Sequence, residues 1–181
     1  MASWKPPDSV GPNEHIGRRL FDEPMLKGAA GQPSYSGLSL QHFEETRGDE
    51  VSLDRLGASS IDPKVARYLV PRAEAAGRIH KNTKRFDGWA VVTSKELVKE
   101  RKEGKLSIIA SPIENPEPND NIYHAHVARL GDFSAYQMAL HLRHIFTRYG
   151  RVEQNKVREE TWRDRLWAHP ITRWILAKLG L

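Results

Sequence analysis

Hydrophobic and polar residues in the stretch 86–130 follow the order strand, helix, strand, long turn, strand. Positions 88–93 are rich in β-forming side chains, and a helical stretch, 94–103, comes next. Thr93 and Glu96 have the spacing of a capping box at its start, and Gly104 suits its end. Strands are predicted at 105–111 and 122–130, because the prolines and asparagines of 112–121 form a turn that a helix cannot cross. We expect the rest of the domain to pack around this unit.

The clearest helical period in the chain covers residues 134–149 and ends before Gly150. Its apolar side chains fall on one stripe, which predicts a face buried against the sheet. Together with the inward positions of the neighbouring strands, this predicts one core cluster of Trp89, Val91, Ile108, Leu142, Ile145 and Phe146.

The N-terminal half has weaker signals. A short strand is expected at 15–21, and alternation predicts further strands at 37–43, ending near His42, and at 51–56, so that the last two form a hairpin. Asp62 and Pro63 are typical of a helix start. Pro71 then predicts a kink or two short helices that end near Gly77.

These elements predict an α+β fold, with a small, mainly antiparallel sheet, two principal packed helices at 94–103 and 134–149, and a C-terminal helical tail. The expected divisions are an irregular N-terminal arm and loop at 1–36, an α+β body at 37–150, and a basic, tryptophan-rich helical tail at 151–181.

Composition narrows the functional classes. Hydrophobic residues make up 39% of the 181 residues, which is enough for a folded core. The chain has no cysteine, which excludes disulfides, thiolate metal ligands and cysteine nucleophiles. It also lacks the glycine-rich motifs that bind nucleotide phosphates, so we expect no cofactor. No apolar segment is long enough for a signal peptide or a membrane span, and we expect a cytoplasmic protein without an integral membrane segment.

Positive charge is concentrated at the C-terminal end, where residues 148–181 hold eight Lys and Arg against four Asp and Glu. Tryptophan and arginine on short amphipathic helices suit a protein groove, a nucleic acid or a membrane surface. We therefore predict a binding or accessory protein that engages a protein partner or an anionic polymer through the tail; peripheral membrane contact, or docking of the tryptophans on the body, are the alternatives. The predicted binding residues are Trp162, Arg163, Arg165, Trp167, Arg173 and Trp174.

A second functional class is indicated by His124 and His126, which stand two positions apart on a predicted strand. Side chains at that spacing share one face, so the two imidazoles are expected to be neighbours. Such a pair serves as acid and base in phosphodiester cleavage, or it binds a metal. The alternative is a pair of partly buried, hydrogen-bonded histidines with a structural role.

Known metal patterns do not fit the histidine pair. A cupin-type site needs a glutamate about four residues after the pair, where Leu130 stands. A metallo-β-lactamase-type site needs His-x-His-x-Asp-His, which residues 127–129 do not continue. We therefore predict no metal ion at this site. A third ligand from elsewhere in the chain, such as His42, would make a metal site the alternative. The alternative function is thus a small, toxin-like nuclease or phosphodiesterase that is independent of metal, with His124, His126, His42 and Arg129 as its catalytic residues.

Overall fold

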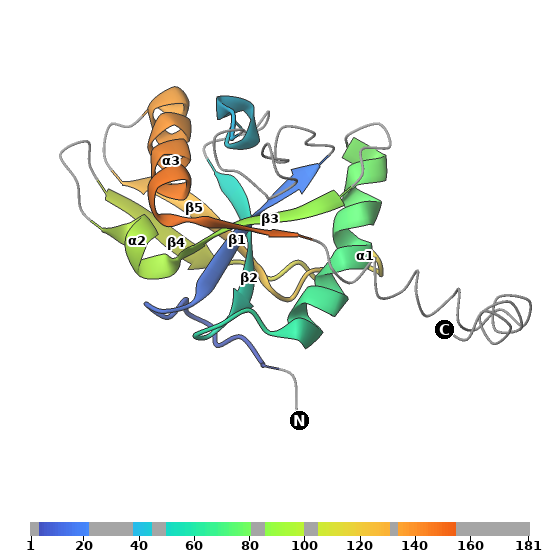
Figure 1. Ribbon diagram of the computed structural model, residues 1–181. Helices are drawn as coiled ribbons and strands as arrows, with labels where there is room; N and C mark the ends of the chain where they lie inside the picture. Colours follow the sequence, from blue (N-terminus) through green and yellow to red (C-terminus); the bar gives the residue numbers. More distant parts are fainter. Residues whose placement is uncertain are drawn as a thin grey trace, which may run out of the picture.

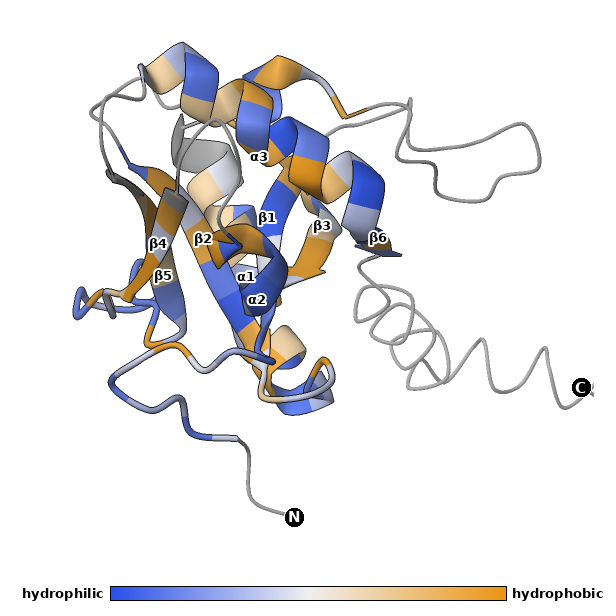
Figure 2. Ribbon diagram, turned by 90° about the vertical axis from the view of Figure 1, so that its left-hand side faces the viewer, coloured by the Kyte–Doolittle hydropathy of each residue, from blue (hydrophilic) through white to orange (hydrophobic). Residues whose placement is uncertain are grey.

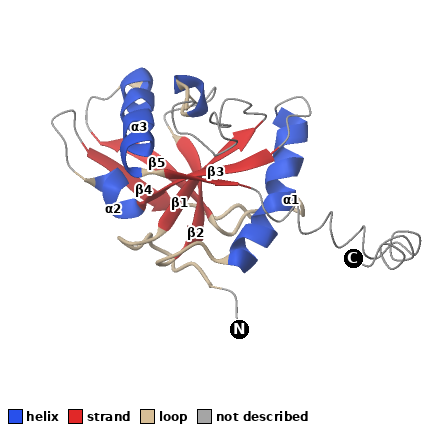
Figure 3. Cartoon of the chain, viewed as in Figure 1, coloured by secondary structure: helices blue, strands red, loops and turns tan. Residues whose placement is uncertain are grey.

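The computed structural model describes residues 4–21, 38–44, 50–80, 86–99, 105–130 and 134–154. Within these residues the chain forms an α+β fold whose six-stranded sheet has the order β4-β5-β2-β1-β3-β6 (Figures 1 and 3). Every neighbouring pair of strands is antiparallel. The strands are β1 (His15–Phe21), β2 (Val51–Gly57), β3 (Phe86–Thr93), β4 (Lys105–Ala110), β5 (His124–Leu130) and β6 (Arg151–Gln154). The helices are α1 (Pro63–His80), α2 (Ser94–Val98), α3 (Ala135–Tyr149) and the short 3-10 turn η3 (Leu40–His42).

The unit predicted at 86–130 is present as β3, α2, β4, a long turn and β5. Its helix is shorter than expected, because α2 has five residues. The predicted capping box is wrong: Thr93 occupies the N-cap, but its side chain makes no capping hydrogen bond. A capping box instead begins α3, where Ser134 and Gln137 satisfy each other's backbone N–H groups.

Helix α1 is one element rather than two short helices, because it runs for 18 residues with Pro71 inside it. Proline removes one backbone donor and crowds the preceding turn. Val65, Leu69 and Ala73 are fully buried, whereas Pro71 lies on the exposed side of the helix. Burial of that apolar face outweighs the local penalty, and α1 is the longest helix in the described part of the chain.

The strand predicted at 37–43 is also wrong, since Leu40–His42 forms the 3-10 turn η3. Leu38 and Phe43 are buried beside α3, and the Arg143 side chain donates to the carbonyl oxygen of Leu38 at 2.8 Å. The alternation of apolar and polar residues at 37–43 thus corresponds to the turn η3, which packs on α3, and not to a strand. Strand β2 bonds to β1 and β5 instead of forming the expected hairpin.

The sheet takes residues from both predicted terminal segments. Strand β1 falls within the segment assigned to an irregular arm, yet it lies between β2 and β3. Residues 151–154, expected to begin a helix, form β6 and pair with β3. The predicted helical tail beyond residue 154 lies outside the described residues.

The core is divided by the sheet into two clusters, with α3 on one side and α1 on the other (Figure 1; coloured by hydropathy in Figure 2). Ile108, Leu142, Ile145 and Phe146 belong to the α3 side, but Trp89 and Val91 belong to the α1 side. The expectation of one cluster was therefore wrong. Adjacent side chains of a strand point to opposite faces, so β3 contributes Ala90 and Val92 to one cluster and Trp89 and Val91 to the other.

Leu142→Ala should lower the free energy of unfolding by about 2–5 kcal/mol, because it leaves a cavity in the α3-side core. Leu142 is fully buried there. Chemical denaturation of the two proteins measures the difference. The exposed Leu140→Ala on the same helix is the matched control, with a change expected within about 0.5 kcal/mol. Equal losses for the two variants would contradict the assignment of the buried stripe.

Candidate functional site

His124 and His126 lie on one face of β5, as expected from their spacing. In the register of the sheet, Asp54 is opposite His124 and Ser52 is opposite His126. Ala125 and Val127 are fully buried and point to the other face, where Val127 joins the α3-side core. The histidines therefore share the α1 side of the sheet.

Ser111 joins the two imidazoles. Its Oγ lies 2.8 Å from Nδ1 of His124 and 2.9 Å from Nδ1 of His126. The carbonyl oxygen of Ser111 also lies 2.8 Å from Nδ1 of His124. On the far side of His126, Nε2 is 3.4 Å from Oε1 of Glu50, whose side chain is 61% exposed. A chain of polar groups thus runs from His124 through Ser111 and His126 to Glu50.

The hydrogen-bond partners fit opposite tautomers of the two imidazoles. A carbonyl oxygen only accepts, so Nδ1 of His124 carries a proton and its Nε2 carries the lone pair. In the arrangement that these contacts fit, the Ser111 hydroxyl donates to Nδ1 of His126, and the proton of His126 is on Nε2, where Glu50 Oε1 lies 3.4 Å away. One ring thus presents a base at Nε2 and the other presents an acid.

Beside this chain lies a buried carboxylate, Asp54, whose oxygens accept four hydrogen bonds. Arg19 donates from Nε at 2.7 Å and from Nη2 at 2.8 Å. Trp89 Nε1 and Asn121 Nδ2 each donate at 2.8 Å. Gly17 makes room for the indole, because a Cβ there would lie 2.8 Å from Cδ1 of Trp89. Asp54 therefore fixes the guanidinium of Arg19, which is 21% exposed, on the same face as the histidines.

Two pKa shifts follow from these surroundings. Burial lowers the pKa of His124 below its ordinary value of 6.5, and the Arg19 charge adds to that effect against opposing contributions from Ser111 and Asp54. Burial alone would raise the pKa of Asp54. The charge of Arg19 and the hydrogen bonds that the Asp54 carboxylate accepts outweigh this effect and hold the pKa of Asp54 below 3.8. At neutral pH, His124 is therefore an uncharged imidazole beside an ionised Asp54.

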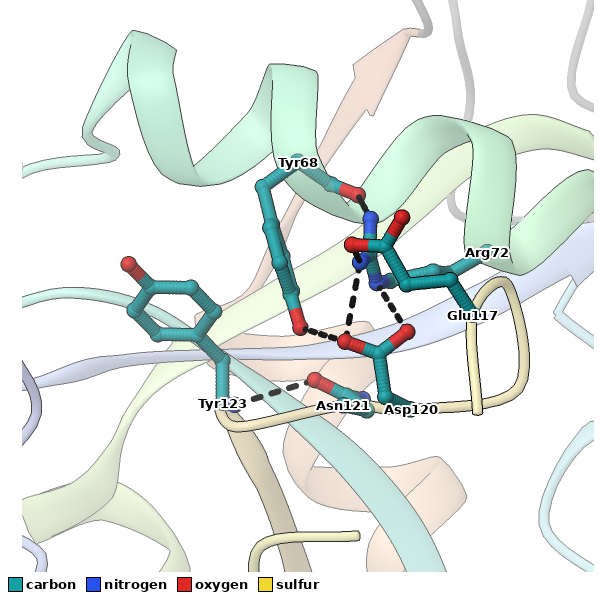
Figure 4. Close-up of polar contacts among 6 residues, drawn as sticks. All are labelled: Tyr68, Arg72, Glu117, Asp120, Asn121 and Tyr123. Carbon is teal, nitrogen blue, oxygen red and sulfur yellow. Dashed lines mark hydrogen bonds and ion pairs between the residues drawn. The ribbon is translucent and has the colours of Figure 1, made fainter. Parts of the chain in front are cut away.

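The turn between β4 and β5 is clamped to α1, as Figure 4 shows. Arg72 binds Asp120 through Nε at 2.9 Å and Nη2 at 2.8 Å, and it reaches Glu117 at 2.7 Å. The guanidinium lies over the ring of Tyr68, 3.5 Å from its centroid, and the Tyr68 hydroxyl donates to Asp120 at 2.6 Å. Asn121 follows directly, so the clamp helps to place the side chain that binds Asp54.

The neighbours of His126 across the sheet are accessible to solvent. Ser52 on β2 is exposed, and Ile109 on β4 is 45% exposed. Helix α1 packs mainly on β3 and β2. The β2 and β4 residues on either side of His126 are thus in contact with solvent, and the His126 side chain itself is 14% exposed.

Of the other predicted catalytic residues, His42 lies elsewhere, and the position of the Arg129 side chain stays a prediction. His42 lies in η3, on the α3 side of the sheet, and its Nδ1 contacts Ser39. Arg129 belongs to β5, but its side chain lies outside the described part of the structure. Arg55, a further candidate cation, is buried and bound to Glu14 and to the carbonyl oxygens of Pro7 and Ser9.

These bonds also attach Pro7, Ser9 and Glu14, which belong to the predicted irregular N-terminal segment, to Arg55 of β2. The binding surface predicted on the tail lies outside the described residues, so its protein, nucleic-acid or membrane partner stays a prediction. It comprises Trp162, Arg163, Arg165, Trp167, Arg173 and Trp174.

Sequence reasoning missed Ser111, Arg19, Asp54 and Asn121. Asp54 had one signal, since it is an acidic residue inside a predicted strand, between Leu53 and Arg55. Ser111 had none, because its importance comes from the strand pairing that brings it beside β5.

Within the described ranges, no three His, Asp or Glu side chains are grouped to hold a metal ion, and no helix is long and apolar enough to cross a membrane. Comparisons of this chain with protein-family models, with curated proteins and with solved structures find no match. The function of the candidate site is therefore inferred from its geometry alone.

Proposed function

We propose that the protein cleaves single-stranded RNA without a metal ion, using His124 as general base and His126 as general acid. The observation that carries the proposal is the pair of imidazoles joined through Ser111, whose contacts fit opposite tautomers. Catalysis at a phosphodiester needs one group that takes a proton and another that supplies one. The lone pair on Nε2 of His124 and the proton on Nε2 of His126 meet that need on one accessible face.

In the proposed reaction, the substrate supplies its own nucleophile. Nε2 of His124 takes the proton of a ribose 2′-hydroxyl, and the 2′-oxygen forms a bond to phosphorus. The bond from phosphorus to the 5′-oxygen breaks, and that oxygen receives the proton from Nε2 of His126. The products are a 2′,3′-cyclic phosphate and a free 5′-hydroxyl.

Arg19 supports this assignment. The transition state carries negative charge on the phosphoryl oxygens, which a fixed cation stabilises. Asp54 engages Nε and Nη2 of Arg19 and leaves Nη1 as the nitrogen that it does not bind. Because Asp54 is ionised, the Arg19–Asp54 pair has no net charge. Stabilisation of the transition state therefore depends on the position of the Arg19 guanidinium.

The test is incubation of the full chain with a single-stranded RNA oligonucleotide in EDTA, with the ends of the products identified by mass spectrometry. We expect cleavage with 2′,3′-cyclic phosphate ends, and none of the same sequence made with 2′-deoxyribose. His126→Gln, purified identically, controls for a contaminating nuclease and should be inactive. RNA left intact by the wild-type protein, or cleaved equally by His126→Gln, would refute the proposal.

A further inference from the structure

Ser111 is the one group that contacts both imidazoles in the described part of the chain. Its Oγ is within hydrogen-bond distance of Nδ1 of His124 and of His126, at 2.8 Å and 2.9 Å. Both contacts use Nδ1, so Ser111 leaves Nε2 of each ring unbound by its hydroxyl. The three side chains thus form a continuous path for protons between the two reacting nitrogens.

Such a path avoids the formation of a charged imidazole during the reaction. A neutral imidazole that donated its proton from Nε2 would become an anion, and a base that accepted one would become a cation. His126 has only 14% of its side chain exposed and His124 is more than half buried, so both charged states would be poorly solvated. A proton delivered to the opposite nitrogen of the same ring removes the charge as it forms.

We propose that Ser111 is a proton relay that couples the base to the acid, an inference that rests on the cleavage proposed above. As Nε2 of His124 takes the 2′-hydroxyl proton, its Nδ1 proton passes to Oγ of Ser111. The Ser111 hydroxyl proton passes to Nδ1 of His126, and Nε2 of His126 gives its proton to the departing 5′-oxygen. One proton enters and one leaves, so no imidazole becomes charged.

The relay leaves the two rings with exchanged tautomers. Water attack on the cyclic phosphate runs the path in reverse: the water proton goes to Nε2 of His126, the P–O2′ bond breaks, and the 2′-oxygen takes the proton of Nε2 of His124. This step yields a 3′-phosphate and restores the first state. The carbonyl oxygen of Ser111 favours that state, because it accepts a hydrogen bond from Nδ1 of His124 only there.

The ionisable groups around the relay come from two strands, β1 and β2, and from the segment before β2. Asp54 and Arg19 face His124 from β2 and β1, and Glu50 faces His126. Asp54 and Arg19 are bound to each other, so neither takes up the relayed proton. Glu50 contacts only the outer nitrogen of His126, where the substrate binds in this scheme.

Ser111→Ala breaks the path, and Ser111→Thr keeps a hydroxyl in it. For the wild-type protein and the threonine variant, the cleavage rate should rise with pH and then stay level up to about pH 9, because the relay works with neutral rings. The alanine variant should be slower by about 10²-fold at about pH 8 and should show a bell-shaped profile, because its acid must now be a protonated imidazole. The matched control is Ser107→Ala on β4, expected to behave as wild type.

Melting temperatures of the variants show whether each is folded. An alanine variant that keeps the wild-type rate and profile, or a threonine variant as slow as alanine, would overturn the relay while the cleavage proposal stood. Absence of RNA cleavage by the wild-type protein would overturn both. A rate that depends nonlinearly on the deuterium fraction of the solvent, and becomes linear in Ser111→Ala, is the expected signature of several protons in motion.

Discussion

Replacing Asp54 with alanine is expected to lower the free energy of unfolding by about 3–5 kcal/mol, the usual cost of removing one partner of a buried ion pair. Arg19 would lose the carboxylate that binds its Nε and Nη2. Trp89 Nε1 and Asn121 Nδ2 would become buried donors without an acceptor. The loss should fall toward the lower end of the range, because the Arg19 side chain is 21% exposed and water can replace part of the contact.

Equilibrium denaturation in urea measures this effect, and Asp8→Ala is the control because Asp8 is an exposed carboxylate. Its substitution should change stability by no more than about 0.5 kcal/mol. If Asp54→Ala is as stable as the Asp8 variant, Asp54 does not organise the site in the way described.

Stability should also depend on pH through Asp54. Its pKa is lower in the folded chain than the ordinary value of 3.8 that applies to the unfolded chain. The stabilisation is therefore fully present above the unfolded value and is lost as the pH falls through the folded one. Asp54→Asn should flatten this part of the acid-unfolding curve, and a curve parallel to that of the wild-type protein would contradict the assignment.

Replacing His124 with glutamine is expected to reduce RNA cleavage by about 10²–10⁴-fold, the usual contribution of a general acid or base. Glutamine keeps an uncharged, hydrogen-bonding side chain of similar length at this position, so stability should change little. The rate constant under single-turnover conditions measures the effect on the chemical step.

The matched control is His144→Gln on the exposed side of α3, which should cleave RNA at the wild-type rate. Loss of stability in His124→Gln with cleavage intact would instead assign His124 a structural role.

Features with a local cause could be predicted from the sequence. Period-two alternation placed His124 and His126 on one face of a strand, and the 3.6-residue period identified the buried stripe of α3. The prolines and asparagines at 112–121 correctly separated two strands. Each of these patterns depends on a residue and its near neighbours in the chain.

Local patterns also misled where packing decides the outcome. Pro71 predicts an interrupted helix, but α1 continues because Val65, Leu69 and Ala73 are buried against the sheet. Alternation at 37–43 resembles a strand, yet the segment forms a turn packed beside α3. In both cases burial of apolar surface outweighs a weak local preference.

The sequence by itself determined the α+β class, most strands of the sheet and the shared face of the two histidines. Only the tertiary structure decided which groups meet them. Arg19 and Asp54 are 35 positions apart, and Asn121 is 67 positions from Asp54. Ser111 lies between the histidines because β4 pairs with β5 in one register. A buried charge or a shared proton needs partners from several strands, and strand order and register, which no local pattern encodes, bring those partners together.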